Sequence, residues 1–152
     1  MRLKKKNLGV ILMPQYYDNS VQAIFTSLLE QKNFGEVILV GWAYVEYIID
    51  LTILYEFKAI NADEIRKEFL TRGTFEQKWQ SIKKLDIFTT EEKTKITRFQ
   101  KQRNRMFHKV LFNKEEYYSP QGKEKLMSAA SDAFWAEHDG FTKKYVGKQN
   151  FY

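Results

Sequence analysis

The chain has 152 residues, of which 43% are hydrophobic, 16% aromatic and 29% charged, with a formal net charge of +6. This length and aromatic content indicate one ordered domain with a substantial core. Because there are no cysteines and two histidines, we exclude a disulfide scaffold, cysteine-ligated metal sites and thiol catalysis, and we expect no metal or other cofactor.

The chain opens with a predicted N-terminal arm, residues 1–17, followed by a helix. Basic residues before the apolar run Leu8–Met13 imitate a signal peptide, but the run is short, Pro14 closes it and no small-residue cleavage site follows. Asn19 and Ser20 can cap the helix. Its apolar residues recur with helical spacing at Val21, Ile24, Phe25, Leu28 and Leu29.

The next element is a long apolar helix, predicted over residues 35–58. The stretch Val37–Phe57 is about the length of a membrane span, yet it contains three acids, Glu46, Asp50 and Glu56. Acids near a bilayer centre cost several kcal/mol each, so we expect a buried central helix in a soluble, cytoplasmic protein without membrane association. Its aromatic residues are expected to pack in the core or in a dimer interface: Trp42, Tyr44 and Tyr47.

A short helix is predicted over residues 64–70, and the remaining bundle helices are predicted over residues 75–85, 91–112 and 120–141. Thr89 precedes the acids Glu91 and Glu92, a helix-start signal, and Ser119-Pro120 opens the last helix. No stretch alternates as a strand would. The fold class is therefore all-α, a single-domain bundle of four or five helices spanning residues 1–152 with its core at about 20–141. The residues expected to face inward on the last helix are Leu126, Ala130, Ala133, Phe134 and Phe141.

The positive charge is concentrated in one predicted helix. Glu91–Lys114 contains eight basic and two acidic residues, so this segment carries the whole excess of the chain. Its apolar positions are Ile96, Phe99, Met106, Phe107 and Val110, and Arg103 occupies the register position between Phe99 and Met106 where an apolar residue is expected.

A charged side chain at such a position needs a partner. One explanation is an internal salt bridge to Glu46 or Asp50, which lie four residues apart on one helix face. The alternatives are an anion site and an arginine at the surface. His108 follows five residues after Arg103, about 140° around an ideal helix, whereas Asn104 and His108 share a face. The three side chains could converge if a second copy of the helix packs alongside.

The run Arg103-Asn104-Arg105-Met106-Phe107-His108 resembles the signature of the HEPN superfamily (higher eukaryotes and prokaryotes nucleotide-binding). That signature is an arginine, often followed by asparagine, with a histidine four to six residues later. The preceding segment 74–102 and the apolar helix containing Glu46 also resemble the family pattern. The resemblance covers about residues 20–141 and implies a small helical bundle, often a metal-independent endoribonuclease whose site forms in a homodimer.

The resemblance implies a toxin or antiviral defence effector that cleaves RNA by attack of the 2′-hydroxyl group. Its implied catalytic residues are Arg103, which binds the scissile phosphate, His108 as acid or base, and Asn104 as a positioning or phosphate-binding group. The residues expected to bind flanking RNA phosphates are Lys101, Arg105 and Lys109. The implied partners are RNA, a second copy, and an antitoxin or regulatory protein.

Other readings of these residues remain open. A non-catalytic HEPN-fold module could bind nucleotide, RNA or a partner protein, and a DNA-binding helical protein is a weaker alternative without a recognition-helix turn signature. Val110 occupies the position at which some related toxins carry a modifiable tyrosine, so regulation there is not expected. Tyr117 and Tyr118 lie too far along the chain to replace that tyrosine. His138 is expected at the surface, near the end of the last helix.

Overall fold

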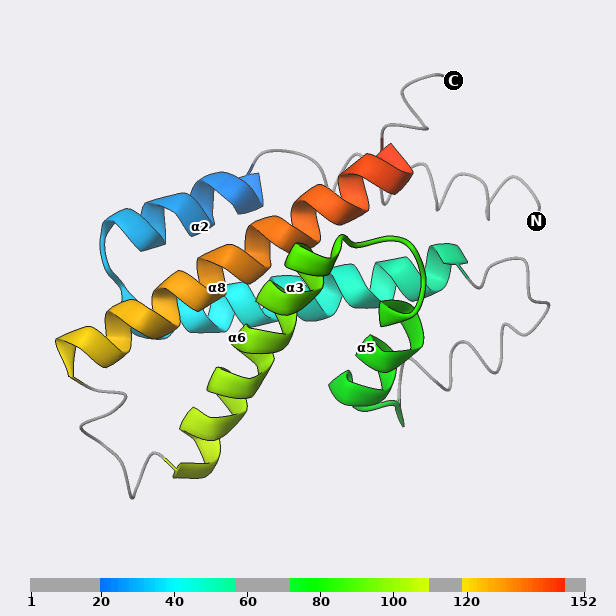
Figure 1. The fold of residues 1–152 in the computed structure, drawn as a ribbon. Helices are drawn as coiled ribbons and strands as arrows, with labels where there is room; N and C mark the ends of the chain where they lie inside the picture. The colour runs from blue at the N-terminus through cyan, green and yellow to red at the C-terminus, as the bar shows by residue number, and fades with distance from the viewer. Residues whose placement is uncertain (1–19, 57–71, 110–118, 147–152) are drawn as a thin grey trace.

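The computed structural model describes residues 20–56, 72–109 and 119–146. Within these ranges the chain forms α-helices and no strand, which confirms the all-α class (Figure 1). The helices are α2 (Ser20–Glu30), α3 (Phe34–Glu56), α5 (Phe75–Lys83), α6 (Thr90–Lys109) and α8 (Pro120–Phe141), which continues into a short π-helical segment, η1 (Thr142–Val146). The arm 1–17, the helix predicted over 64–70 and the predicted end of the basic helix beyond Lys109 lie outside the described residues.

The helices α3 and α8 form the centre of the bundle. Helix α8 packs against both α3 and α6, whereas α2 and α5 pack against α3 (Figure 1). Helix α3 is the one described helix that is long and apolar enough to cross a membrane. Most of the residues in its apolar stretch are buried inside the bundle, so α3 is the core helix that its composition indicated.

Local capping contacts explain where the helices begin. The Thr89 hydroxyl accepts a hydrogen bond from the Glu92 backbone N–H (3.1 Å), and the Glu92 carboxylate accepts one from the Thr89 N–H (2.7 Å). This is a capping box, and it confirms the predicted start of α6. Ser119 likewise accepts a bond from the Gly122 N–H, with Pro120 in the first turn of α8.

Aromatic stacking joins α2, α3 and α8. The Phe134 ring lies 4.1 Å from Phe25 on α2 and 3.9 Å from Tyr44 on α3, measured between ring centroids. All five residues predicted to face inward on α8 are buried, which confirms that prediction: Leu126, Ala130, Ala133, Phe134 and Phe141. One apolar prediction for α2 is wrong, because Ile24 is 54% exposed. The buried stripe of α2 is centred on Phe25, and Ile24 lies about 100° around the helix from it.

Candidate functional site

Arg103 lies over aromatic rings rather than beside a carboxylate. Its guanidinium carbon is 4.0 Å from the centre of the Trp42 ring on α3 and 4.6 Å from that of Phe107 on α6. A guanidinium can lie flat on an aromatic face, where the ring quadrupole attracts the charge. This contact explains how a half-buried arginine can occupy an apolar register position.

The expected salt bridge from Arg103 to Glu46 or Asp50 does not form within the described ranges. Glu46 Oε1 instead accepts a hydrogen bond from the Trp42 indole (2.6 Å), and Asp50 Oδ1 lies 3.0 Å from Lys78 Nζ on α5. Burial lowers the pKa of Arg103, and the nearby charge of Glu46 opposes that shift. The charge of Glu46 therefore favours the charged form of Arg103 without a direct ion pair. Both side chains also contact the Trp42 indole.

Asn104 is the one proposed catalytic partner that the fold brings to Arg103. Arg103 Nη1 donates a hydrogen bond to Asn104 Oδ1 (3.1 Å), and Asn104 is half-buried. His108 is exposed, one helical turn beyond Asn104, and makes no hydrogen bond or ion pair to another described residue. Because Arg103 points at α3, the arginine and the histidine remain on different sides of α6 within one chain.

A polar face runs along α6 and ends at His108. Steps of three or four residues place its members within about 60° of one line along the helix. Each is exposed or half-buried, and none is acidic: Thr90, Thr94, Thr97, Lys101, Asn104, Arg105 and His108. The acids Glu91 and Glu92 are in the first turn of the helix, where Glu91 lies beside this face and Glu92 on the opposite side of the helix.

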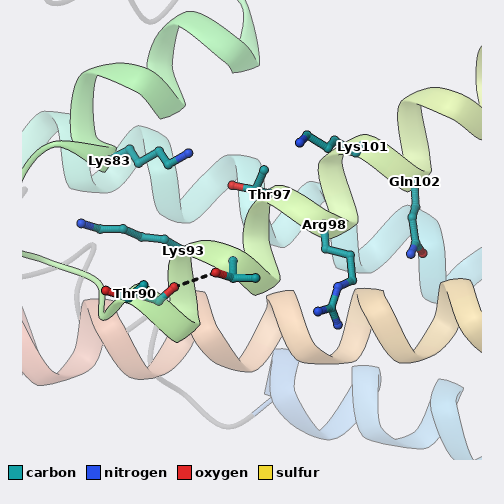
Figure 2. Close-up of a pocket in the computed structure, with 8 residues that line it drawn as sticks. Lys83, Thr90, Lys93, Thr97, Arg98, Lys101 and Gln102 are labelled. Carbon is teal, nitrogen blue, oxygen red and sulfur yellow. Dashed lines mark hydrogen bonds between the residues drawn. The ribbon is translucent and has the colours of Figure 1, made fainter.

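The first half of this face is hollowed into a groove of about 540 Å³ between α5 and α6 (Figure 2). Figure 2 shows Lys83 reaching from the end of α5 towards the side chains of α6. Among the described residues, the lining contains four cations and no acid: Lys83, Lys93, Arg98 and Lys101, with Thr90, Thr94, Thr97 and Gln102 between them. We call this surface the basic groove.

The three expected phosphate-binding residues have different surroundings. Lys101 is exposed and lines the basic groove, and Arg105 is exposed one turn further along α6. Lys109 is the last described residue of α6, and its side chain lies outside the described part of the structure. Sequence reasoning missed Lys83, Lys93 and Arg98 as groove residues. The regular polar spacing of residues 90–108 was a signal that could have indicated the α6 members.

The prediction for His138 is right about its place near the end of the last helix and wrong about its exposure. It lies half-buried in the last turn of α8, where its Nδ1 is 3.0 Å from the Tyr44 hydroxyl and 3.3 Å from the Gln22 amide nitrogen. Trp135 packs edge-on against its ring, and burial lowers the pKa of His138. These contacts tie α8 to α2 and α3, so the side chain has a structural role.

No group of three or more histidine, aspartate or glutamate side chains in the described ranges could hold a metal ion.

Comparison of the sequence and fold with family models, curated proteins and solved structures finds no match. The functional reading of this chain therefore depends on its own residues and their arrangement.

Proposed function

We propose that this chain is a metal-independent endoribonuclease of HEPN type that acts as a homodimer. The observation that supports it best is the acid-free polar face of α6, which leads from a groove lined by four cations to Asn104 and His108. Cations and hydroxyl groups are the usual ligands of nucleic-acid phosphates. The only exposed titratable imidazole of the described residues stands at the end of that face.

The chemistry requires the 2′-hydroxyl group of the substrate, which restricts it to RNA. The 2′-oxygen loses its proton to a base and forms a bond to the neighbouring phosphorus. The bond from phosphorus to the 5′-oxygen then breaks, and an acid protonates that oxygen. The products are a 2′,3′-cyclic phosphate and a free 5′-hydroxyl end. An imidazole can serve as either acid or base near neutral pH, so His108 from each of two copies supplies both roles.

Arg103 stabilises the charge that develops on the phosphate oxygens. In a single chain it faces Trp42, on a different side of α6 from His108. A second copy resolves this separation, because Arg103 of one chain can then meet His108 of the other. Phe107 is 58% exposed beside Arg103 and offers apolar surface for such a contact.

The decisive experiment is incubation of the purified chain with single-stranded RNA in excess EDTA. We expect the wild-type chain to cleave the RNA. His108→Ala and Arg103→Ala should each reduce the rate by at least about 100-fold, which is the usual contribution of one acid–base or charge-stabilising group. Lys125→Ala, an exposed change on α8, is the matched control and should cleave normally. Circular dichroism must show that all variants fold. Absence of cleavage by wild-type protein, or equal cleavage by every variant, would refute the proposal.

A second candidate is a non-catalytic RNA-binding module of the same fold. The hydrogen bond from Arg103 to Asn104 and its contact with Trp42 favour it, because they hold the arginine away from His108 in one chain. This candidate predicts that the wild-type chain binds RNA and leaves it intact. It also predicts that sedimentation shows only monomer at concentrations where RNA is bound.

A further inference from the structure

The basic groove gathers four cations that have no ion-pair partner among the described residues. Lys83, Lys93, Arg98 and Lys101 form no ion pair with the described residues, whereas Lys95 on the same helix pairs with Glu91 (3.2 Å). Four cations gathered around one hollow repel each other, and they attract a polyanion.

Glu76 on α5 is an acid that feels the charge of two groove cations, and its carboxylate is already hydrogen-bonded. Hydrogen bonds from the side-chain amides of Gln100 and Gln80 lower the pKa of Glu76, and the charges of Lys83 and Lys101 lower it further. Glu76 does not line the groove. Its carboxylate accepts both amide hydrogen bonds and forms no ion pair with Lys83 or Lys101.

The shape of the groove suits a linear ligand. Its α6 members recur at every turn from Thr90 to Gln102, which spans about 18 Å along the helix axis. The Thr97 hydroxyl oxygen accepts a hydrogen bond from the Trp79 indole (3.2 Å), so its own hydrogen points elsewhere and can be donated. The Thr94 hydroxyl already donates to the Thr90 carbonyl oxygen (2.9 Å), so Thr97 is the hydroxyl that can serve a ligand. A row of cations at helical spacing with this hydroxyl between them fits successive phosphates of one strand.

The residues that line the groove also distinguish it from a membrane-binding surface. An interfacial helix places large apolar side chains beside its cations. The exposed large apolar side chains of the described residues all lie outside the groove: Ile24, Leu39, Tyr47 and Phe107. The same polar face of α6 continues without an acid from Lys101 to His108, so a strand that leaves the groove along α6 arrives at the proposed cleavage residues.

We propose that the basic groove binds the phosphodiester backbone of single-stranded RNA and guides the strand along α6 to His108. This proposal rests on the proposed function for the identity of the ligand and adds a second, sequence-independent binding site to it. Lys83, Lys93 and Arg98 are its binding residues, together with Lys101 from the expected phosphate set. Because the groove contacts phosphates and none of its described lining residues is aromatic, the groove does not select bases.

The test measures binding separately from cleavage. Full-length protein carrying His108→Ala is titrated into fluorescein-labelled polyuridine at several salt concentrations, and fluorescence anisotropy gives the affinity. Lys93→Ala with Arg98→Ala removes two groove cations, and Lys83→Ala removes the cation that α5 contributes. Lys125→Ala with Lys143→Ala is the matched control, because it removes the same charge from exposed positions outside the groove.

Each phosphate contact with a single strand changes the slope of log affinity against log salt by about 0.7, which corresponds to about fivefold in affinity at about 0.1 M salt. We therefore expect about 25-fold weaker binding for Lys93→Ala with Arg98→Ala and a slope smaller by about 1.4. Lys83→Ala should weaken binding about fivefold, and the control pair should lose much less. The losses should be the same for polyuridine and for a strand of mixed sequence.

Equal RNA binding by the groove variants and the control variants would overturn the groove proposal. Binding of polyglutamate without any binding of RNA would also overturn it. These outcomes are separate from those of the proposed nuclease. RNA binding that depends on the groove, in a wild-type chain that never cleaves, supports the groove and refutes the nuclease. Cleavage that is unchanged by Lys93→Ala with Arg98→Ala at subsaturating RNA supports the nuclease and refutes the groove.

Discussion

Glu137→Gln should gain stability relative to wild-type protein as the pH rises. Glu137 lies on α8 with no exposed surface, and neither carboxylate oxygen has a hydrogen-bond partner in the described ranges. Burial raises the pKa of Glu137 well above its ordinary value, and the nearby charge of Glu92 raises it further. The folded protein therefore keeps this carboxyl protonated at pH values where the unfolded chain has released the proton.

The sign of the effect follows from proton counting. Below about pH 4.3, the ordinary pKa of glutamate, both states hold the proton and Glu137 contributes no pH dependence. Between that pH and the raised folded pKa, unfolding releases one proton, so stability falls by about 1.4 kcal/mol for each pH unit. Glutamine cannot titrate. Its burial adds a constant difference, and the pH-dependent loss disappears.

The assay is urea unfolding of wild-type protein and Glu137→Gln at pH 5 and pH 6. We expect the variant to gain about 1.4 kcal/mol relative to wild type between these two values. Glu124→Gln, an exposed change on the same helix, should show no such gain. Parallel stability curves for wild type and Glu137→Gln would refute the reasoning, because they would mean that Glu137 ionises alike in both states.

Two further predictions concern packing and a buried polar contact. Gly140→Ala should destabilise the fold by about 1–3 kcal/mol, because a β-carbon there would lie 2.6 Å from Phe88 Cε1 and closer still to Cδ1. Gly35→Ala, which meets no atom within 4 Å, should raise stability by up to about 1 kcal/mol, and thermal melts of both variants check this contrast. Tyr44→Phe should cost about 1 kcal/mol in urea unfolding, because His138 loses the hydroxyl at 3.0 Å. A Tyr44→Phe variant as stable as wild type would contradict the structural role of that histidine.

The sequence predicted the helices well because helix boundaries depend on neighbouring residues. The Thr89–Glu92 capping box and the Ser119–Pro120 start are contacts within one turn, so spacing alone reveals them. The burial predictions that were wrong, for Ile24, Phe107 and His138, concern which way a side chain faces at the edge of an apolar stripe. That choice depends on the neighbouring helix, which the local sequence does not contain.

Arg103 illustrates the same division in the candidate site. Register alone identified it as a charge at an apolar position and left a salt bridge to α3, an anion site and a surface position open. Trp42 and Glu46 lie four residues apart on that helix and both were within reach. Tertiary packing placed the guanidinium on the indole, while Glu46 accepts the hydrogen bond of the indole N–H. The sequence pattern is the same for an arginine that stacks on an aromatic ring and for one that pairs with a carboxylate.

By itself, the sequence determined the helical class, the location of the positive charge on α6 and the order of residues along its polar face. These depend on helical period and local charge, which are short-range properties. Only the tertiary structure decided that Lys83 of α5 joins Lys93, Arg98 and Lys101 around one groove, and that Arg103 of α6 lies on the Trp42 ring of α3. Both are distances between groups on separate helices or faces, and packing of the whole core sets them.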